Sequence, residues 1–98
     1  MEFEWDPAKN AANIAKHGID FAGAVKIFSG DTVEYSDIRR DYGEIRVNAI
    51  GEINGKEIVV IYTPRAEKRR IISARRARDY ERAAFRYVYP GQSAQGSN

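Results

Sequence analysis

The chain has 98 residues, with 16 lysines and arginines, 14 aspartates and glutamates, one histidine and no cysteine. This length allows one small domain, and the lack of cysteine excludes disulfides, thiol nucleophiles and cysteine-based zinc sites. No apolar run approaches the ~18 residues of a membrane span, and the acidic N-terminus lacks the apolar core of a signal peptide. We therefore expect a soluble, cytoplasmic protein.

Two helices are predicted at the N-terminal end. Asp6 and Pro7 favour a helix start and Gly18 is typical of the left-handed residue after a helix, which together predict a helix over 7–17. Asp20 is a second N-cap. Apolar residues recur after it with helical spacing, at Phe21, Ala24, Val25 and Phe28.

Four strands and a last helix are predicted next. Asn54-Gly55 is the strongest short hairpin signal, and it joins strands over 44–53 and 56–63. The other two strands and the helix are expected at 32–37, 69–74 and 75–89. The apolar stripe of this helix consists of Ala77, Tyr80, Ala84 and Tyr87.

The predicted class is α+β, with two N-terminal helices, a four-stranded antiparallel sheet and a C-terminal helix. All helices are expected to cover one face of the sheet. Residues 1–90 form the single predicted domain, and 91–98 are expected to be a flexible tail.

The hairpin sets which side chains share a sheet face. A two-residue turn pairs Ile53 with Lys56, and a pairing of Arg65 with Arg69 extends this register into the fourth strand. The face expected to carry the helices consists of Ile45, Val47, Ala49, Ile58, Val60, Tyr62, Ile72 and Ala74. The face expected to be open consists of Glu44, Arg46, Asn48, Ile50, Val59, Ile61, Thr63, Ile71, Ser73 and Arg75.

Charge is distributed unevenly along the chain. Residues 1–49 carry a net charge of −3 and residues 50–98 a net charge of +5, and eleven of the sixteen basic residues are arginine. Arginine binds phosphate in a bidentate manner, so a basic half of this kind indicates nucleic acid or an acidic protein partner. The alternative is a solvated helix face with no partner.

The open face is suited to a phosphodiester. It gathers guanidinium and hydroxyl groups, which can neutralise a phosphate and stabilise the charge that develops during cleavage. RNA supplies its own nucleophile, the 2′-hydroxyl, so such a site needs neither a protein nucleophile nor a cofactor. The groups concerned are those of Arg46, Asn48, Thr63, Arg65, Ser73 and Arg75.

His17 is the only histidine of the chain. Histidine is the residue type that ordinarily titrates near neutrality, so it could act as the acid or base of RNA cleavage. Its place at the end of the predicted helix also fits a capping role, because the helix dipole favours a cation there. Position alone leaves both roles open.

An ordered set of short motifs, spread over about residues 3–87, resembles the BrnT toxin family. The motifs are Phe3-Glu4-Trp5-Asp6, Lys16-His17-Gly18, Gly43-Glu44-Ile45-Arg46, Tyr62-Thr63-Pro64-Arg65 and Arg70-Ile71-Ile72-Ser73-Ala74-Arg75. The resemblance implies a RelE-like fold and the toxin of a type II toxin–antitoxin system. It also implies metal-independent RNA cleavage that inhibits translation, without a cofactor.

The resemblance also implies site residues and partners. The catalytic set is His17, Arg46, Arg65, Ser73 and Arg75, and the RNA-binding set is Lys9, Lys16, Arg69, Arg70 and Arg76. No metal ligand is implied, and the face argument places Arg70 beneath the sheet or at its edge. The implied partners are RNA and a BrnA-type antitoxin, in a heterotetramer that touches operator DNA only through the antitoxin.

Two other functions stay open at this point. A non-catalytic nucleic-acid-binding module would show salt-sensitive affinity without cleavage. A protein-interaction module with a basic C-terminal helix would bind a partner strongly and RNA weakly.

Overall fold

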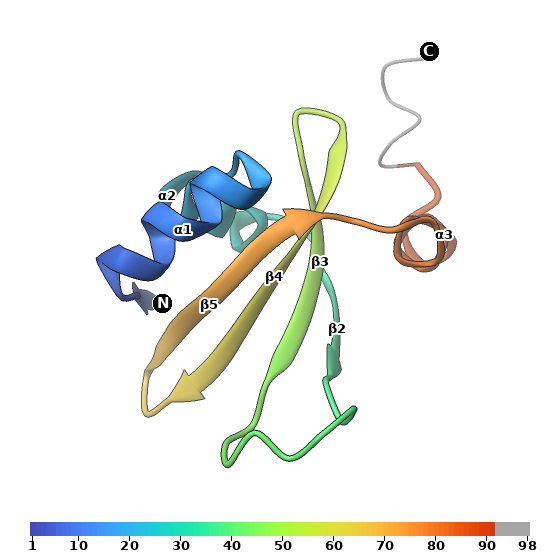
Figure 1. Cartoon of the computed structure of the whole chain (residues 1–98). Coiled ribbons are helices and arrows are strands. Elements are labelled where there is room, and N and C mark those ends of the chain that lie inside the picture. Colours follow the sequence, from blue (N-terminus) through green and yellow to red (C-terminus); the bar gives the residue numbers. More distant parts are fainter. Residues whose placement is uncertain (92–98) are drawn as a thin grey trace.

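The computed structural model describes residues 1–91 and shows an α+β fold built on a five-stranded mixed sheet (Figure 1). The strands are β1 (Glu2–Glu4), β2 (Val33–Ser36), β3 (Val47–Ile53), β4 (Lys56–Arg65) and β5 (Lys68–Arg76). The helices are α1 (Pro7–His17), α2 (Phe21–Ala24), the 3-10 helix η1 (Val25–Ser29) and α3 (Asp79–Val88). The α+β class is confirmed, and the predicted tail from residue 92 onwards lies outside the described residues.

The prediction of a four-stranded antiparallel sheet is wrong in one respect. The strand order is β1-β5-β4-β3-β2, and β1 pairs in parallel with the edge of β5, with Glu2 opposite Lys68. Three residues are too few to show an alternating pattern, so the sequence offers no strand signal there. The other four strands pair antiparallel as predicted.

Local signals define the first helix and the hairpin. The Asp6 side chain accepts a hydrogen bond of 2.8 Å from the Ala8 N–H, and Gly18 ends α1 in the left-handed conformation. Asn54 and Gly55 both have positive φ angles, and Ile53 pairs with Lys56 as predicted. A two-residue turn of this kind matches the twist of the strands it joins.

A β-bulge in β5 alters the predicted faces. Ile61 pairs with Ser73 as expected, but Tyr62 pairs with Ile71, so Ile72 is the extra residue. The bulge brings Ile71 onto the face that carries α1 and α2, where it is fully buried, although it was predicted on the open face. Ile72, predicted in the core, is only half-buried.

The helices cover both faces of the sheet, which corrects the prediction that they share one. α1, α2 and η1 lie on one side and α3 on the other (Figure 1). Phe85 of α3 packs in a second buried cluster with Ile50 and Val59, both predicted to be open. β5 continues to Arg76 and the chain then crosses to the far face before α3 begins.

The buried side of α3 also differs from the prediction. Tyr80 and Tyr87, expected to pack, are 62% and 88% exposed. The helix starts four residues later than predicted, at Asp79, and buries Glu81 and Phe85 instead. No helix among residues 1–91 is long and apolar enough to cross a membrane.

Asn13 attaches α1 to the sheet. Its side-chain amide donates hydrogen bonds of 2.9 Å to the carbonyl oxygens of Ile19 and Ala74. Its Oδ1 accepts a hydrogen bond of 3.1 Å from the Ala74 N–H. Ala74 lies on β5 beyond the short stretch covered by β1, so this one amide replaces a neighbouring strand there.

We expect Asn13→Ala to lower the free energy of unfolding by about 2–4 kcal/mol, because the substitution leaves buried backbone groups of β5 without partners. Thermal unfolding followed by circular dichroism measures this effect. A melting temperature within experimental error of the wild type would contradict the role given to Asn13.

Candidate functional site

A basic groove lies over the part of the sheet that α3 leaves uncovered. It consists of two adjoining hollows that share Lys16, His17, Ile72 and Ser73. Seven of its described lining residues are basic and one is acidic, so it suits an anionic ligand. The basic residues are Lys9, Lys16, His17, Arg39, Arg46, Arg75 and Arg78, and the acidic residue is Asp37.

Six of the ten predicted site residues meet in this groove. α1 supplies Lys9, Lys16 and His17, while β5 supplies Ser73 and Arg75. Arg46 joins them from the segment just before β3. The structure thus brings together residues up to 66 positions apart in the sequence.

The other four predicted site residues lie elsewhere. Arg65 is 3.5 Å from Glu44, and Arg70 is 3.5 Å from Glu4 of β1 at the sheet edge. Arg69 stacks on the ring of Phe28, with 4.4 Å between the guanidinium carbon and the ring centroid. Each of these three arginines therefore has a structural partner away from the groove.

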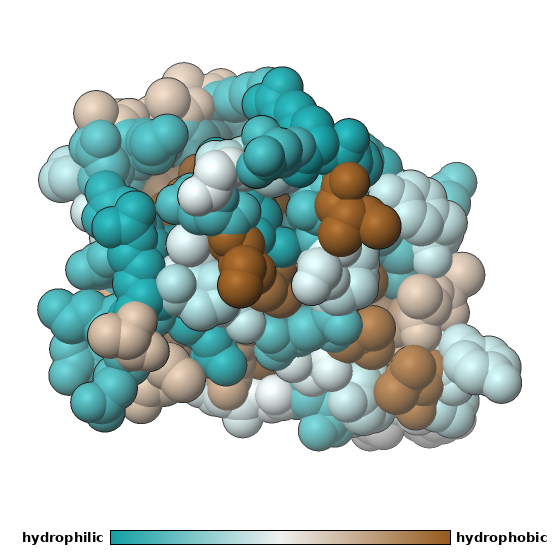
Figure 2. Space-filling model, turned by 90° about the horizontal axis from the view of Figure 1, so that it is seen from below, coloured by the Kyte–Doolittle hydropathy of each residue, from teal (hydrophilic) through white to brown (hydrophobic). Residues whose placement is uncertain are grey.

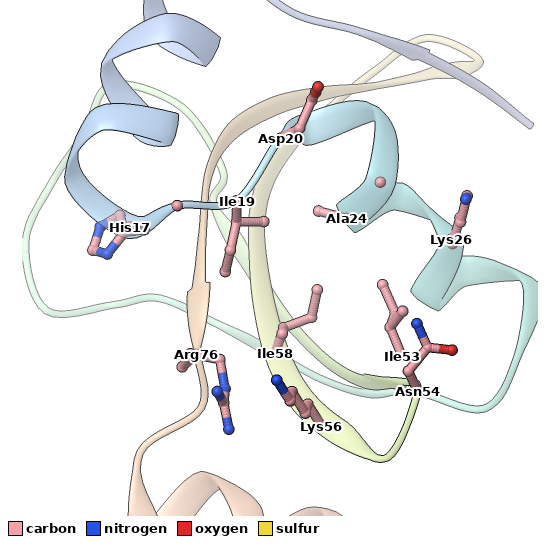
Figure 3. Close-up of a pocket in the computed structure, with 12 residues that line it drawn as sticks. His17, Ile19, Asp20, Ala24, Lys26, Ile53, Asn54, Lys56, Ile58 and Arg76 are labelled. Atoms are coloured by element: carbon pink, nitrogen blue, oxygen red, sulfur yellow. The ribbon is translucent and has the colours of Figure 1, made fainter.

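Arg76 lines a different hollow of about 510 Å³ on the other side of His17 (Figure 3). This hollow lies between the α1–α2 connection, η1 and the β3–β4 hairpin. Its lining is more apolar than that of the groove, with Ile19, Ile53 and Ile58 directed into it.

A buried carboxylate organises the end of the groove nearest α3. The Glu81 side chain is 1% exposed, and its two oxygens accept hydrogen bonds of 2.7 and 2.8 Å from the guanidinium of Arg75. They also accept from the Arg78 backbone N–H and from the Tyr35 hydroxyl, both at 2.8 Å. All the strong acceptor positions of the carboxylate are therefore used.

These hydrogen bonds keep Glu81 ionised. Burial alone would raise the pKa of Glu81, but Arg75, the Arg78 N–H and the Tyr35 hydroxyl together hold that pKa at about 2. Burial and the Glu81 carboxylate in turn raise the pKa of Tyr35 above 10, so its hydroxyl keeps its proton at neutral pH. The Tyr35 hydroxyl uses this proton to donate a hydrogen bond to Glu81.

The orientation of Asn48 follows from this network. The Tyr35 hydroxyl points its hydrogen at Glu81, so its oxygen can only accept from Asn48, whose Nδ2 donates to it at 3.2 Å. Asn48 Oδ1 must then face away from Tyr35. This oxygen is buried and has no hydrogen-bond partner in the described structure, although Asn48 lines the groove.

Arg46 presents an unused donor on the same groove. Its guanidinium stacks on Tyr42, 4.0 Å from the ring centroid, and its buried Nε has no hydrogen-bond partner. The nearest carboxylate oxygen, on Glu44, is 3.7 Å from Nε, which is too far for a hydrogen bond. Among the described residues that line the groove, Arg46 thus has a buried donor and Asn48 a buried acceptor without partners.

Asp37 is not a source of protons. Arg39 binds its carboxylate with hydrogen bonds of 3.0 and 2.9 Å, and the Tyr42 hydroxyl donates at 3.1 Å. The Arg39 guanidinium holds the pKa of Asp37 well below its usual range. Asp37 therefore stays ionised and orders the loop that carries Arg39 and Tyr42.

Sequence reasoning missed several residues of the groove. Asn48 was placed among the polar groups of the open face, but its free oxygen was not predicted, because it depends on Tyr35 and Glu81, which are distant in sequence. Arg39 and Arg78 lie in a loop and at a helix cap, where no periodic pattern marks them. Among residues 1–91, no three His, Asp or Glu side chains are grouped to hold a metal ion.

Comparison with known families gives one match. The family described as "Ribonuclease toxin, BrnT, of type II toxin-antitoxin system" matches residues 5–81. This range includes every lining residue of the basic groove. No curated protein matches the chain.

Removal of the cation next to Glu81 should destabilise the fold. We expect Arg75→Ala to lower the free energy of unfolding by about 3–5 kcal/mol, because it leaves a buried carboxylate without its counter-charge. Chemical denaturation measures the change. Arg65→Ala is the matched control and should cost less than about 1 kcal/mol, because its ion pair with Glu44 is exposed. Equal effects of the two substitutions would contradict the role of Arg75.

The same carboxylate predicts a pH dependence of stability. The pKa of Glu81 is about 2 in the folded state against 4.5 ordinarily, so folding stabilises the ionised form. This contribution is complete above pH 4.5 and is lost as the pH falls towards 2. The difference in the free energy of unfolding between wild type and Glu81→Gln should therefore shrink as the pH falls from 4.5 to about 2. A difference that is constant with pH would contradict the low pKa of Glu81.

Proposed function

We propose that the basic groove cleaves RNA, because the chain belongs to the BrnT family of ribonuclease toxins of type II toxin–antitoxin systems. Membership of this family implies an RNA substrate and an antitoxin partner. One observation carries the assignment to the groove: among its cations lie a buried free donor, Arg46 Nε, and a buried free acceptor, Asn48 Oδ1.

These two atoms match RNA better than other polyanions. Buried polar atoms normally have partners, and a ligand that enters the groove can supply both of the missing ones. A phosphate oxygen satisfies Arg46 Nε, but phosphates offer nothing to Asn48 Oδ1, which requires a donor. RNA carries such a donor, the 2′-hydroxyl, beside each phosphate, whereas DNA does not.

We propose a reaction in which the 2′-hydroxyl attacks the adjacent phosphorus. The new bond joins the 2′-oxygen to phosphorus and the bond to the 5′-oxygen breaks, which leaves a 2′,3′-cyclic phosphate and a 5′-hydroxyl. The 2′-oxygen loses a proton and the 5′-oxygen gains one. Arg46 and Lys16 stabilise the negative charge on the phosphate during this exchange.

His17 is the proposed proton-transfer group. It lies at the junction of the two hollows beside Ser73, and Asp37 is held ionised by Arg39. Ser73 offers a hydroxyl that binds the phosphate or the leaving oxygen. Lys9 extends the cationic track along α1 for the flanking nucleotides.

Arg75 has a different task from the one first assigned to it. Both of its terminal nitrogens bind Glu81, so it positions the network behind Asn48. Arg65, Arg69 and Arg70 have partners outside the groove, and we assign them no part in cleavage.

The finer identity of the partner is also a proposal. We propose a BrnA-type antitoxin that binds the toxin directly in the cytoplasm, in a heterotetramer whose operator DNA contacts come from the antitoxin. The family supports an antitoxin in general terms, and its type and the assembly follow from the resemblance of the motifs in the sequence.

We expect purified protein to cleave RNA at an unchanged rate in excess EDTA, because the side chains of the groove supply the positive charge and RNA supplies the nucleophile. Gel analysis of a labelled RNA measures the rate. Loss of cleavage in EDTA, restored by a divalent ion, would refute metal independence.

In the same assay His17→Gln should lower the rate by about 10²–10⁴-fold, since glutamine cannot titrate.

Asn48→Ala should selectively impair the use of RNA. We expect kcat/KM for RNA to fall by about 10–100-fold, the cost of one lost hydrogen bond to the 2′-hydroxyl. Inhibition by DNA of the same sequence should be unchanged, because DNA lacks this group. Lys16→Ala is the matched control, since the loss of a phosphate contact weakens the binding of RNA and DNA alike. Equal losses for RNA and DNA in Asn48→Ala would contradict the role of Asn48.

A further inference from the structure

The hollow on the other side of His17 differs chemically from the groove. Its floor is formed by Ile19, Ile53 and Ile58, which Figure 3 shows directed inwards from three separate segments. His17 carries the one aromatic ring among its described lining residues, and none of these residues has a buried polar atom without a partner. It therefore has no Phe, Tyr or Trp ring on which bases could stack, and it lacks the free polar atoms that mark the groove.

The rim of this hollow carries unpaired cations. Lys26, Lys56 and Arg76 form no ion pair with any carboxylate of the described residues. The basic residues of α3 are different, because Arg82 pairs with Asp79 and Arg86 with Glu57. The one carboxylate in the hollow, on Asp20, caps α2 through the Ala22 N–H. Free positive charge is thus concentrated around an apolar floor.

We propose that this hollow is the docking site of the antitoxin, which inserts an apolar side chain between the isoleucines and places acidic side chains against Lys26, Lys56 and Arg76. The occupant is an acidic, amphipathic segment. This proposal rests on the proposed function only in taking the partner to be the antitoxin of the toxin–antitoxin pair. Charge complementarity of this kind accelerates association, and the buried apolar anchor sets the affinity.

The position of the hollow explains how docking would neutralise the toxin. His17 lines both the hollow and the groove. An occupant of the hollow therefore contacts the side chain to which we assign proton transfer, without filling the RNA site. The antitoxin, bound in the hollow, would restrict the movement of the His17 side chain.

The opposite end of the molecule offers a weaker alternative. Ile38 and Ile45, in the segment between β2 and β3, are 86% and 66% exposed. Figure 2 shows this end from below, where brown apolar residues lie apart from one another among hydrophilic ones. Scattered exposed apolar residues are common on soluble proteins and do not by themselves mark an interface.

Gly23 allows the hollow to be filled without disturbing the fold. It lines the hollow on α2, and no atom lies within 4 Å of the position that its Cβ would take. Gly23→Leu therefore places a side chain in the hollow. Ala22→Leu is the matched control, because Ala22 is exposed on the same helix and does not line the hollow.

The test measures affinity for the antitoxin, using the protein encoded by the reading frame adjacent to the toxin gene as the probe. We expect Gly23→Leu to weaken binding by about 100-fold, and Ala22→Leu to bind like the wild type. The melting temperature should be unchanged in both, and Ala22→Leu should cleave RNA like the wild type. Binding of Gly23→Leu at wild-type affinity would overturn the proposal.

A charge-reversed variant provides an independent arm. Lys26→Glu combined with Lys56→Glu should slow association about tenfold at low salt, whereas Lys68→Glu, at the other end of β5 from Arg76, should not. If the pair of substitutions instead raises KM for RNA and leaves antitoxin binding intact, the hollow belongs to the RNA path and the proposal is wrong. The affinity for the antitoxin is measured without any cleavage assay. Absence of ribonuclease activity would therefore refute the proposed function and leave the docking result valid.

Discussion

The ion pair between Arg75 and Glu81 holds together the part of the structure on which the groove depends. A buried carboxylate is costly unless it is paired and fully hydrogen-bonded, and Glu81 meets both conditions with donors from β5, β2 and the start of α3. Because Tyr35 donates to Glu81, Asn48 must donate to Tyr35. The orientation of the Asn48 side-chain amide therefore follows from the negative charge of Glu81 on α3.

The two ends of the groove are positioned by different means. At one end, charge-assisted hydrogen bonds hold α3 against the sheet. At the other, the neutral amide of Asn13 attaches α1 to β5 and so positions Lys16 and His17. His17 lines both the groove and the apolar hollow, so in our proposals the same side chain transfers protons and contacts the antitoxin.

The features that the sequence predicts well are local. The caps of α1 and the Asn54-Gly55 hairpin depend on neighbouring residues, and Ile53 pairs with Lys56 as predicted. The predicted pairing of Arg65 with Arg69 is wrong, because Arg65 lies opposite Lys68, and the bulge at Ile72 restores the predicted register at Ser73. The missed features depend on distant residues. The bulge at Ile72 and the burial of Glu81 under α3 arise from tertiary packing, and a charged helix residue is ordinarily expected in solvent. Arg65 and Arg70 do not line the groove but lie next to Glu44 and Glu4, which are distant from them in sequence.

The most direct measurement uses a DNA strand that contains a single ribonucleotide, with the products identified by mass spectrometry. If the groove acts through the 2′-hydroxyl held at Asn48, the strand is cut only on the 3′ side of the ribonucleotide, into fragments with a 2′,3′-cyclic phosphate and a 5′-hydroxyl. Cleavage of an all-deoxy strand, or products with a 3′-hydroxyl and a 5′-phosphate, would contradict this mechanism.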